Sequence, residues 1–293
     1  MSVLFWLSLS LCLVLTVSEF RCLDYRSGKG CTSELTADSV NIDVFIPNFR
    51  NAVWTCLNLI TLHNGLSGNH SVRFTVLNMD DDEETIVNCA PSDVRVFHLV
   101  APGKGGESLS AVFKAIPVVS SGQYIVVADS DAVNVAAGWD TTVVNIFRES
   151  PHLKIAGINP RGVAIRGEQS LFAKMVEWNW MVGTYSFLSS LPPHPSGGHG
   201  SFPDWGHYFV SLVFPNEALS WDDCMTVISG KSPTLCRVDP QGRPWVMHSF
   251  YLSRKHRDTN FDDSWVVTPK QELQLIHLVF NRFANFTKTI SSV

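Results

Sequence analysis

The stretch Tyr124-Ile125-Val126-Val127-Ala128-Asp129-Ser130-Asp131 decides the fold prediction, because five apolar residues lead directly into two acids. A short run rich in Ile and Val is typical of a strand buried on both faces of a parallel sheet, and such strands present polar groups at their carboxyl ends. In an extended chain, Asp129 and Asp131 lie on the same side. Carboxylate oxygens are ligands for Mg²⁺ or Mn²⁺, so the pair predicts a divalent cation site that could neutralise a diphosphate. The alternative is that the two acids only cap a turn before Asn134.

Strand and helix patterns alternate around this stretch. Upstream, apolar runs predict strands and helical spacing predicts helices; the strands cover 41–47, 71–77 and 94–100, and the helices cover 53–63 and 109–119. Downstream the pattern is less regular, with strands over 154–158, 162–166 and 245–247, an aromatic helix over 169–187, a loop rich in Pro, Gly and His over 191–206, and a final helix over 270–284. This order predicts an α/β fold with a largely parallel sheet, whose ligands bind at the carboxyl ends of the strands.

Composition limits the classes of protein that the chain can represent. It has 293 residues, of which 45% are hydrophobic and 17% charged, so it can bury one large core, and residues 41–290 are predicted to form a single domain. The formal net charge of -5 means that the chain has no excess of positive charge to attract a polyanion. Nucleic acid is therefore not an expected partner.

The N-terminal segment predicts the compartment. Residues 4–17 are apolar but too few to span a bilayer comfortably, and small residues follow, which is typical of a secretory signal peptide over residues 1–20. An uncleaved signal anchor is the alternative, although the first positive charges, Arg21 and Arg26, come after the apolar run. Residues 21–40 would then be an N-terminal extension. We expect a protein of the endoplasmic reticulum or Golgi lumen, or a secreted one, with membrane association only through this segment.

The cysteines agree with an oxidising compartment. One cysteine lies in the predicted signal peptide, which leaves an even number, namely Cys22, Cys31, Cys56, Cys89, Cys224 and Cys236. Short separations favour two local bridges, the first pair and the last pair, and would leave Cys56 with Cys89, although six cysteines permit fifteen pairings. Two sequons, at Asn69 and Asn285, predict surface acceptors for N-glycan.

From residue 42 to about 144, the order of features resembles the nucleotide-diphospho-sugar transferases of glycosyltransferase A type, particularly their family 2-like group. Four segments carry the resemblance in the family's order: the opening strand and turn at 45–48, the second strand with an acidic loop at 76–81, the segment before an apolar helix at 105–110, and the strand with Asp-x-Asp at 125–131. The resemblance implies a Rossmann-like sheet flanked by helices, with a nucleotide-sugar-binding half over 41–145 and a less regular acceptor-binding half over 146–290.

The same resemblance implies an activity and a role for each matching residue. The activity is transfer of a sugar from a nucleotide-diphospho-sugar to a hydroxyl of a glycan, glycoprotein or glycolipid, with Mn²⁺ or Mg²⁺. Residues at the strand ends would bind the donor: Pro47 and Asn48 line the nucleotide pocket, Asp80 or Asp81 meets the base or ribose, Asp129 contacts the ribose or a metal-bound water, and Asp131 is the direct metal ligand. His248, which follows the last predicted strand, would be a further metal or diphosphate ligand. Ordinary structural roles are the alternative for each of them.

The resemblance is weaker for the catalytic base. An inverting transferase needs a carboxylate that takes the proton of the acceptor hydroxyl. Asp204 is the nearest equivalent, but Pro203 stands where the family often has a first acid, and Asp222 and Asp223 are rivals. Inversion through Asp204 is the preferred prediction over retention.

Two other classes of function compete with the transferase. The first is a catalytically inactive secreted protein of the same fold that binds carbohydrate or nucleotide. The second is an adhesion or structural protein in which the acidic loops bind Ca²⁺. Metal-dependent breakdown of a nucleotide sugar distinguishes both from the transferase.

Overall fold

The structure is a computed structural model that describes residues 20–23, 39–48, 51–79, 83–99, 107–134, 137–158, 177–192, 208–209, 211–214, 216–221, 226–227, 234–237 and 244–248. Five helices are described: α2 (Ala52–Asn64), α3 (Glu83–Cys89), α4 (Glu107–Val119), α5 (Trp139–Glu149) and α6 (Tyr185–Leu188). The strands of the larger sheet are β1 (Phe20–Leu23), β2 (Asn41–Asn48), β3 (Ser71–Asn78), β4 (Arg95–Leu99), β5 (Tyr124–Ala128), β7 (Ile155–Ile158), β8 (Glu177–Thr184) and β9 (Ala218–Trp221). The strands of the smaller sheet are β6 (Ala132–Asn134), β10 (Thr226–Val227), β11 (Thr234–Arg237) and β12 (Pro244–His248).

The larger sheet has the order β1-β4-β3-β2-β5-β8-β7-β9. Strands β4, β3, β2 and β5 are parallel neighbours, whereas β8 is antiparallel to both β5 and β7, and β1 is antiparallel to β4. The smaller sheet is antiparallel in the order β10-β11-β12-β6. The predicted α/β class with a mostly parallel sheet is thus confirmed.

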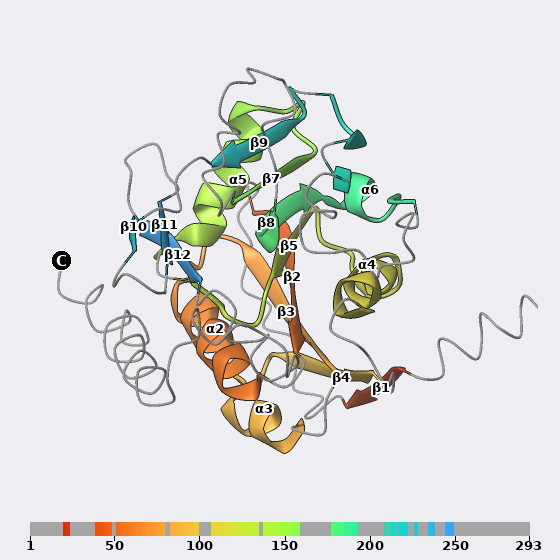
Figure 1. Cartoon of the computed structure of the whole chain (residues 1–293), viewed down its shortest axis with the longest axis vertical. Helices are drawn as coiled ribbons and strands as arrows, with labels where there is room; N and C mark the ends of the chain where they lie inside the picture. Colours follow the sequence, from red (N-terminus) through yellow and green to blue (C-terminus); the bar gives the residue numbers. More distant parts are fainter. Residues whose placement is uncertain are drawn as a thin grey trace, which may run out of the picture.

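Helices cover both faces of the larger sheet (Figure 1). One core cluster joins Ile42, Val44 and Ile46 of β2 to side chains of α2, α3 and α5. A second cluster joins Phe45 of β2 to α4 and α6. Successive strand residues point to opposite faces, so β2 contributes to both cores, and its buried stretch shows no alternation of polar and apolar residues. This burial on both faces is the reason why the sequence reads as continuous apolar runs.

The strand order reverses direction between β2 and β5. From β2 the chain proceeds outward to β3 and β4, and it then returns to the other side of β2 to form β5. The ladder between β2 and β5 has its last paired residues at Phe45 and Val127. Pro47, which has no N–H to donate, therefore lies beyond that ladder. Open α/β sheets bind ligands outside the carboxyl ends of the strands at such a reversal, so the topology predicts a ligand site at this edge.

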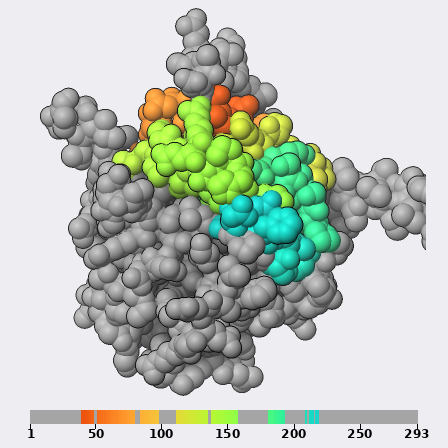
Figure 2. Space-filling model, turned by 90° about the horizontal axis from the view of Figure 1, so that it is seen from above, coloured from red at the N-terminus to blue at the C-terminus, as the bar shows by residue number. Residues whose placement is uncertain are grey.

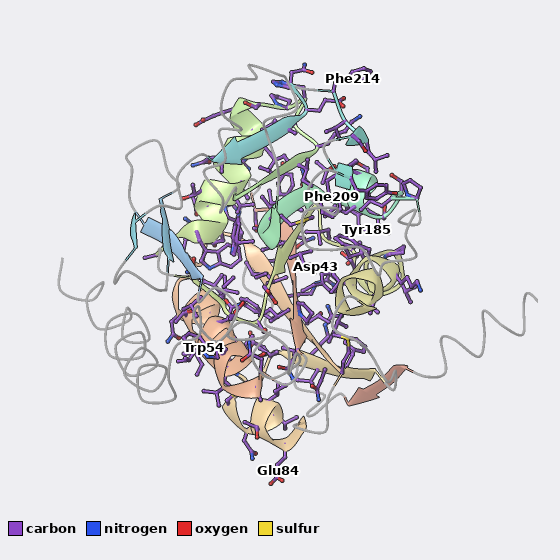
Figure 3. The ribbon with its side chains drawn as sticks, in the orientation of Figure 1. Asp43, Trp54, Glu84, Tyr185, Phe209 and Phe214 are labelled. Atoms are coloured by element: carbon purple, nitrogen blue, oxygen red, sulfur yellow. A yellow bond between two sulfur atoms is a disulfide. The ribbon has the colours of Figure 1, made fainter. Side chains whose placement is uncertain are left out.

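The opposite, amino edge of the sheet is held by an ion pair whose carboxylate is buried. Asp43 of β2 has no exposed surface, and its carboxylate accepts hydrogen bonds from Arg73 Nε at 2.6 Å and Arg73 Nη2 at 2.7 Å. It also accepts from Ser120 Oγ and from the backbone N–H groups of Ser121 and Gly122. Figure 3 labels Asp43 beside the central strands. This single carboxylate joins β2, β3 and the loop before β5.

One sequence prediction is wrong: the aromatic helix expected over 169–187. Its described part, from Glu177 to Thr184, is strand β8, and only Tyr185–Leu188 is helical. Trp180 and Val182 pack in one core cluster and Met181 packs in the other, so β8 is buried on both faces. Because both faces are apolar, the segment lacks the alternation that is typical of a half-buried strand, and its pattern did not distinguish a strand from a helix. Pairing with β5 and β7 on its two sides, rather than local propensity, sets its conformation.

The remaining element predictions within the described residues are confirmed, with boundaries shifted by one or two residues. The bridge between Cys56 and Cys89, one of the pairings left open, is also confirmed and ties α2 to α3. In the described part of the chain, no helix is both long and apolar enough to cross a bilayer. The predicted strand over 162–166 and the final helix over 270–284 lie outside the described residues, as does most of the loop over 191–206.

Candidate functional site at the carboxyl edge of the sheet

Buried polar side chains gather at the carboxyl ends of β2, β3 and β5, at the N-cap and in the first half of α2, and at the end of β6. All of them are at most 5% exposed: Asn48, Asn51, Thr55, Asn58, Asn78, Asp129, Ser130, Asp131 and Asn134. Burial of so many polar groups costs free energy unless they are hydrogen-bonded. Such a cluster at the strand reversal is therefore a candidate site, and its internal bonds show how it is held.

The first part of the cluster joins β2, β3 and α2. Asn48 is aligned with Asn78 in the parallel ladder, and Asn48 Nδ2 donates to Asn78 Oδ1 at 2.8 Å. Thr55 Oγ1 of α2 donates to Asn48 Oδ1 at 2.7 Å. The amide of Asn48 is thus held from both sides, which fixes the end of β2 in one orientation.

The second part joins α2 to the turn after β5. Asn51 occupies the N-cap position of α2, yet its side chain makes no capping bond to the helix. Instead, Asn51 Nδ2 donates to Ser130 Oγ at 2.9 Å, and Asn58 Nδ2 donates to the backbone carbonyl of Asp129 at 2.8 Å. An Asn at an N-cap ordinarily accepts a hydrogen bond from the first turn of its own helix. The Asn51 side chain instead donates to the acidic turn and holds it against α2.

The acidic turn itself is tightly folded. The backbone N–H of Ser130 donates to Asp129 Oδ1 at 2.8 Å, and the N–H of Ala132 donates to the carbonyl of Asp129 at 3.0 Å. Asp129 is 5% exposed and Asp131 has no exposed surface. Residues 130 and 131 form a turn, so the chain is not extended between Asp129 and Asp131. The expectation that the two carboxylates lie on the same side of an extended strand therefore does not apply.

A distant segment of the chain reaches this turn. Strand β12 pairs antiparallel with β6, and His248 is the partner of Ala132, the residue directly after Asp131. Directly opposite residues of antiparallel strands lie about 5 Å apart between Cα atoms. The backbone of the predicted ligand His248 is therefore next to the predicted ligand Asp131, although the two are far apart in the sequence.

The described residues supply two potential ligands for a divalent cation, which is fewer than such an ion needs. Two buried carboxylates in one turn are the hard oxygen donors that Mg²⁺ and Mn²⁺ prefer. Within the part of the chain that the structure describes, no group of three or more His, Cys, Asp or Glu side chains is placed to hold a metal. The backbone of His248, a predicted ligand, is paired with that of Ala132 directly after the two acids.

The structure brings together some of the predicted site residues. Pro47, Asn48, Asp129 and Asp131 all lie at the carboxyl ends of the neighbouring strands β2 and β5, with the backbone of His248 beside them. The predicted nucleotide contacts Asp80 and Asp81 follow β3 but lie outside the described residues, and so do the predicted base Asp204 and its rivals Asp222 and Asp223.

Sequence reasoning missed three polar residues of α2. Asn51, Thr55 and Asn58 occur at spacings of four and three, so they share one face of the helix. Polar residues at this spacing in an otherwise apolar segment were the pattern that could have revealed them. Burial of this face against the acidic turn shows that it belongs to the site.

Comparison with known proteins gives structural likeness alone. No protein-family model matches the chain, and no curated protein matches it. Among solved structures, it is similar to a mannosyltransferase from Pyrobaculum calidifontis in complex with GDP-mannose and Mn²⁺, with 14% identity and a TM-score of 0.47 over 64% of this chain and 56% of that one. The matched part thus spans little more than half of that mannosyltransferase.

Two further solved structures are also similar to the chain. Glucosyl-3-phosphoglycerate synthase from Mycobacterium tuberculosis, in complex with phosphoglyceric acid, matches with 17% identity and a TM-score of 0.45 over 62% of this chain and 69% of that one. TarS from S. aureus matches with 16% identity and a TM-score of 0.43 over 62% of this chain and 58% of that one. Because each TM-score is below 0.5 and each identity below 25%, the function proposed next rests on the chain's own residues.

Proposed function

We propose that this chain is a metal-dependent glycosyltransferase that moves a sugar from a nucleotide-diphospho-sugar to a hydroxyl acceptor. The observation that carries the proposal is the convergence at the strand reversal. There the turn with Asp129 and Asp131 lies at the end of β5, and β12 brings the backbone of His248 next to it. Strand reversals in open α/β sheets are the usual place for nucleotide ligands, and this one has the donor atoms for the cation that accompanies a diphosphate.

In this proposal the cation would be held by Asp131, with Asp129 and His248 as further ligands. When bound, Mn²⁺ or Mg²⁺ neutralises the charge that develops on the departing nucleoside diphosphate. The described residues prepare this edge: Asn58 and Asn51 hold the acidic turn from α2, while Asn78 and Thr55 hold the amide of Asn48. Ligand binding then requires little reorganisation of these side chains.

The nucleotide would lie over the ends of β2 and β3. Pro47 and Asn48 end β2 at this edge, and Asp80 or Asp81 would contact the base or ribose from the loop after β3. Strand pairing supports these assignments, because Asn48 is aligned with Asn78 in the ladder between β2 and β3 and the two acids follow Asn78 within three residues. The parallel pairing of β2 with β5 brings the acidic turn after β5 to the same edge of the sheet.

The acceptor would bind to the half formed by residues 146–290, and a glycan, glycoprotein or glycolipid hydroxyl would attack the anomeric carbon. Asp204 would accept the proton of that hydroxyl, which gives inversion at the sugar carbon. The proposed compartment is the lumen of the secretory pathway, which agrees with the disulfide between Cys56 and Cys89.

The test is a thermal-shift and donor-hydrolysis screen of the chain against UDP-, GDP- and CMP-sugars, with Mn²⁺ or with EDTA. We expect one donor to raise the Tm only in the presence of metal and to release its sugar slowly. Asp131→Asn should remove both responses, because the amide has lost the charge that binds the cation.

Asp140→Asn is the matched control. Asp140 is also fully buried, but it accepts from the N–H and hydroxyl of Ser67, near the far end of α2, about 20 Å along that helix from Asn51. This control should lower the baseline Tm and leave the donor response intact. A wild-type protein that binds nucleotide or sugar with no metal dependence and no hydrolysis would instead establish the catalytically inactive binding protein.

A further inference from the structure

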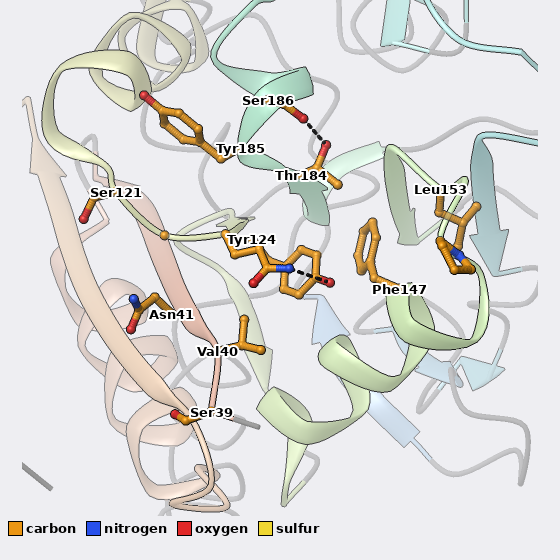
Figure 4. A pocket seen from close by; sticks show the side chains of 13 residues that line it. Ser39, Val40, Asn41, Ser121, Tyr124, Phe147, Leu153, Thr184, Tyr185 and Ser186 are labelled. Carbon is orange, nitrogen blue, oxygen red and sulfur yellow. Dashed lines mark hydrogen bonds between the residues drawn. The ribbon is translucent and has the colours of Figure 1, made fainter. Parts of the chain in front are cut away.

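A cavity of about 620 Å³ lies at the amino edge of the larger sheet, on the side opposite the acidic turn. Its walls come from the start of β2, the loop before β5, the segment after α5, and the junction of β8 with α6 (Figure 4). β5 runs from Tyr124 in this cavity to Asp129 at the other edge, a rise of about 17 Å. One sugar ring cannot reach both places, so this is a second location and not part of the proposed active site.

The lining carries polar groups but no charge. Thirteen residues line the cavity, and none of them is Asp, Glu, Lys, Arg or His. Hydroxyl and amide groups predominate in the polar part, with Ser39, Asn41, Ser121, Gln123, Thr184 and Ser186. Such groups both donate and accept hydrogen bonds, as sugar hydroxyls do. The lining itself offers a diphosphate no charged side chain; the guanidinium of Arg73 donates to the lining residue Ser121 and is paired with Asp43.

Aromatic rings complete the lining. Tyr124 and Phe147 are stacked with centroids 4.6 Å apart, and both are largely buried. Tyr185, which is half-buried, lies on the other side of Tyr124 from Phe147 in Figure 4. Because Tyr124 and Phe147 are only 6% and 4% exposed, they leave little ring surface to a ligand, and Tyr185 is the ring that offers a rigid contact surface with a polar group at its tip. Rings combined with neutral hydroxyl and amide groups fit the apolar C–H faces and the hydroxyl groups of a saccharide.

The walls are fixed before any ligand binds. Asp43 accepts from the backbone of both Ser121 and Gly122, and a Cβ on Gly122 would lie 2.9 Å from the backbone nitrogen of Asp43. Gln123 N–H donates to the carbonyl of Asn41 at 2.8 Å, and Tyr185 N–H donates to the carbonyl of Gln123 at 3.0 Å. Walls held in this way lose little entropy on binding.

One polar atom of the lining lacks a partner within the described structure. Ser39 Oγ is buried and makes no hydrogen bond there. Ser39 is one of the residues that line the cavity. A ligand hydroxyl would supply the missing bond, which adds a reason for a polar occupant.

We propose that this amino-edge cavity, lined by Asn41, Tyr124, Phe147, Tyr185 and Ser186, is a binding site for a neutral oligosaccharide. Its volume is within the range of about 300 to 1,000 Å³ of small-molecule sites, which leaves space for more than one sugar ring. In Figure 2, the coloured atoms of α5 and its following segment lie beside those of residues 180–192, and both segments contribute residues to the lining of the cavity. The site goes beyond the proposed transferase activity and does not depend on it.

The experiment is a titration of the full chain with maltotriose, chitotriose and mannotriose, observed by saturation-transfer difference NMR, with trigalacturonic acid as the charged comparison. We expect at least one neutral trisaccharide to bind with a Kd in the micromolar to low millimolar range and trigalacturonic acid to bind at least tenfold more weakly. Ser186→Trp should weaken binding at least tenfold, because Ser186 is exposed and an indole at this position would fill the cavity.

Three further variants make the result decisive. Asn41→Ala, at another exposed lining residue, should weaken binding without affecting the Tm, and it replaces the tryptophan variant if that one does not fold. Val118→Trp introduces the same side chain at an exposed residue of α4 outside the lining and should leave binding unchanged. Asp131→Asn should also retain trisaccharide binding, even if the transferase proposal fails.

Three results would overturn the proposal. They are the absence of binding by every neutral probe, equal binding of the charged probe, or binding that is lost in Asp131→Asn and kept in the folded Ser186→Trp variant. The last of these would locate the saccharide at the carboxyl edge instead.

Discussion

Replacement of Asp43 by asparagine tests the structural role of the ion pair at the amino edge. In the native protein the Asp43 carboxylate receives two bonds from the Arg73 guanidinium, one from the Ser120 hydroxyl and two from backbone N–H groups. The asparagine amide keeps the size of the side chain but removes the charge. It also directs N–H groups toward neighbours that are themselves donors, so several of these bonds must be lost.

The magnitude follows from burial of the two partners. Removing one member of a buried pair costs about 3 to 5 kcal/mol of stability, because the other charge is left uncompensated. Asp43 has no exposed surface, but the Arg73 side chain is 38% exposed, so water can rehydrate the guanidinium. We therefore expect a loss near the lower limit, about 3 kcal/mol. For a domain of this size that corresponds to a Tm decrease of about 6 to 12 °C.

The assay is thermal and urea unfolding of wild type and Asp43→Asn, followed by circular dichroism. Glu217→Gln is the matched control, because Glu217 pairs with Lys154 at 2.9 Å but its side chain is 16% exposed, whereas that of Asp43 has no exposed surface. Surface pairs contribute little, so this control should shift the Tm much less. The reasoning is refuted if the Asp43 variant loses no more stability than the Glu217 variant.

Acid pH gives an independent measurement of the same pair. Burial opposes the charged form of Asp43, but the bonds from Arg73, Ser120 and Gly122 outweigh burial and lower the pKa of the carboxyl below its ordinary value of 3.8. A lowered folded-state pKa means that the stabilisation is present above pH 3.8 and is lost as the pH falls through the folded-state pKa. Stability of the Asp43→Asn variant should therefore vary less with pH below about 4 than that of wild type.

Three other predictions concern the site, the disulfide and the surface. Asn58→Ala removes the amide that holds the carbonyl of Asp129, so we expect a loss of about 1 to 3 kcal/mol in urea unfolding and slower donor hydrolysis; unchanged values of both would contradict the role of this amide. Cys56→Ser opens a bridge to Cys89 across 33 residues and should cost about 3 to 4 kcal/mol, whereas a reducing agent should then have no further effect through this bond. Asn69 is exposed in a turn, so Asn69→Gln should remove one glycosidase-sensitive mass increment from protein secreted by eukaryotic cells; an unchanged mass would show that the sequon is unused.

The central α/β arrangement was predictable from the sequence because its elements have strong local patterns. β2, β3 and β5 are apolar runs of the right length for strands, and the segments between them have helical spacing. The acidic turn was predictable for the same reason, since Asp129 and Asp131 directly follow such a run. Polar residues at the end of a buried parallel strand necessarily occur at the edge of the sheet.

Strand β8 shows where local pattern fails. Its residues Trp180, Met181 and Val182 contact two different cores on opposite faces, so no polar position interrupts the apolar run. A continuous apolar run does not distinguish a buried strand from a buried helix. Gly183 was the available indication, since glycine disfavours helix interiors. In the structure, a Cβ added to Gly183 would lie 2.8 Å from Cγ of Leu188, so a larger residue fits there only if the Leu188 side chain moves.

The sequence by itself determined the elements with local periodicity and the acids that end β5, because those depend on residues close together in the chain. Only the tertiary structure decided that β12 places His248 beside Ala132, that Asn51 and Asn58 hold the acidic turn, and that a neutral cavity forms at the far edge. Each of these depends on contacts between segments separated by many residues. Such contacts leave no local periodicity, since they arise from the packing of whole strands and helices against one another.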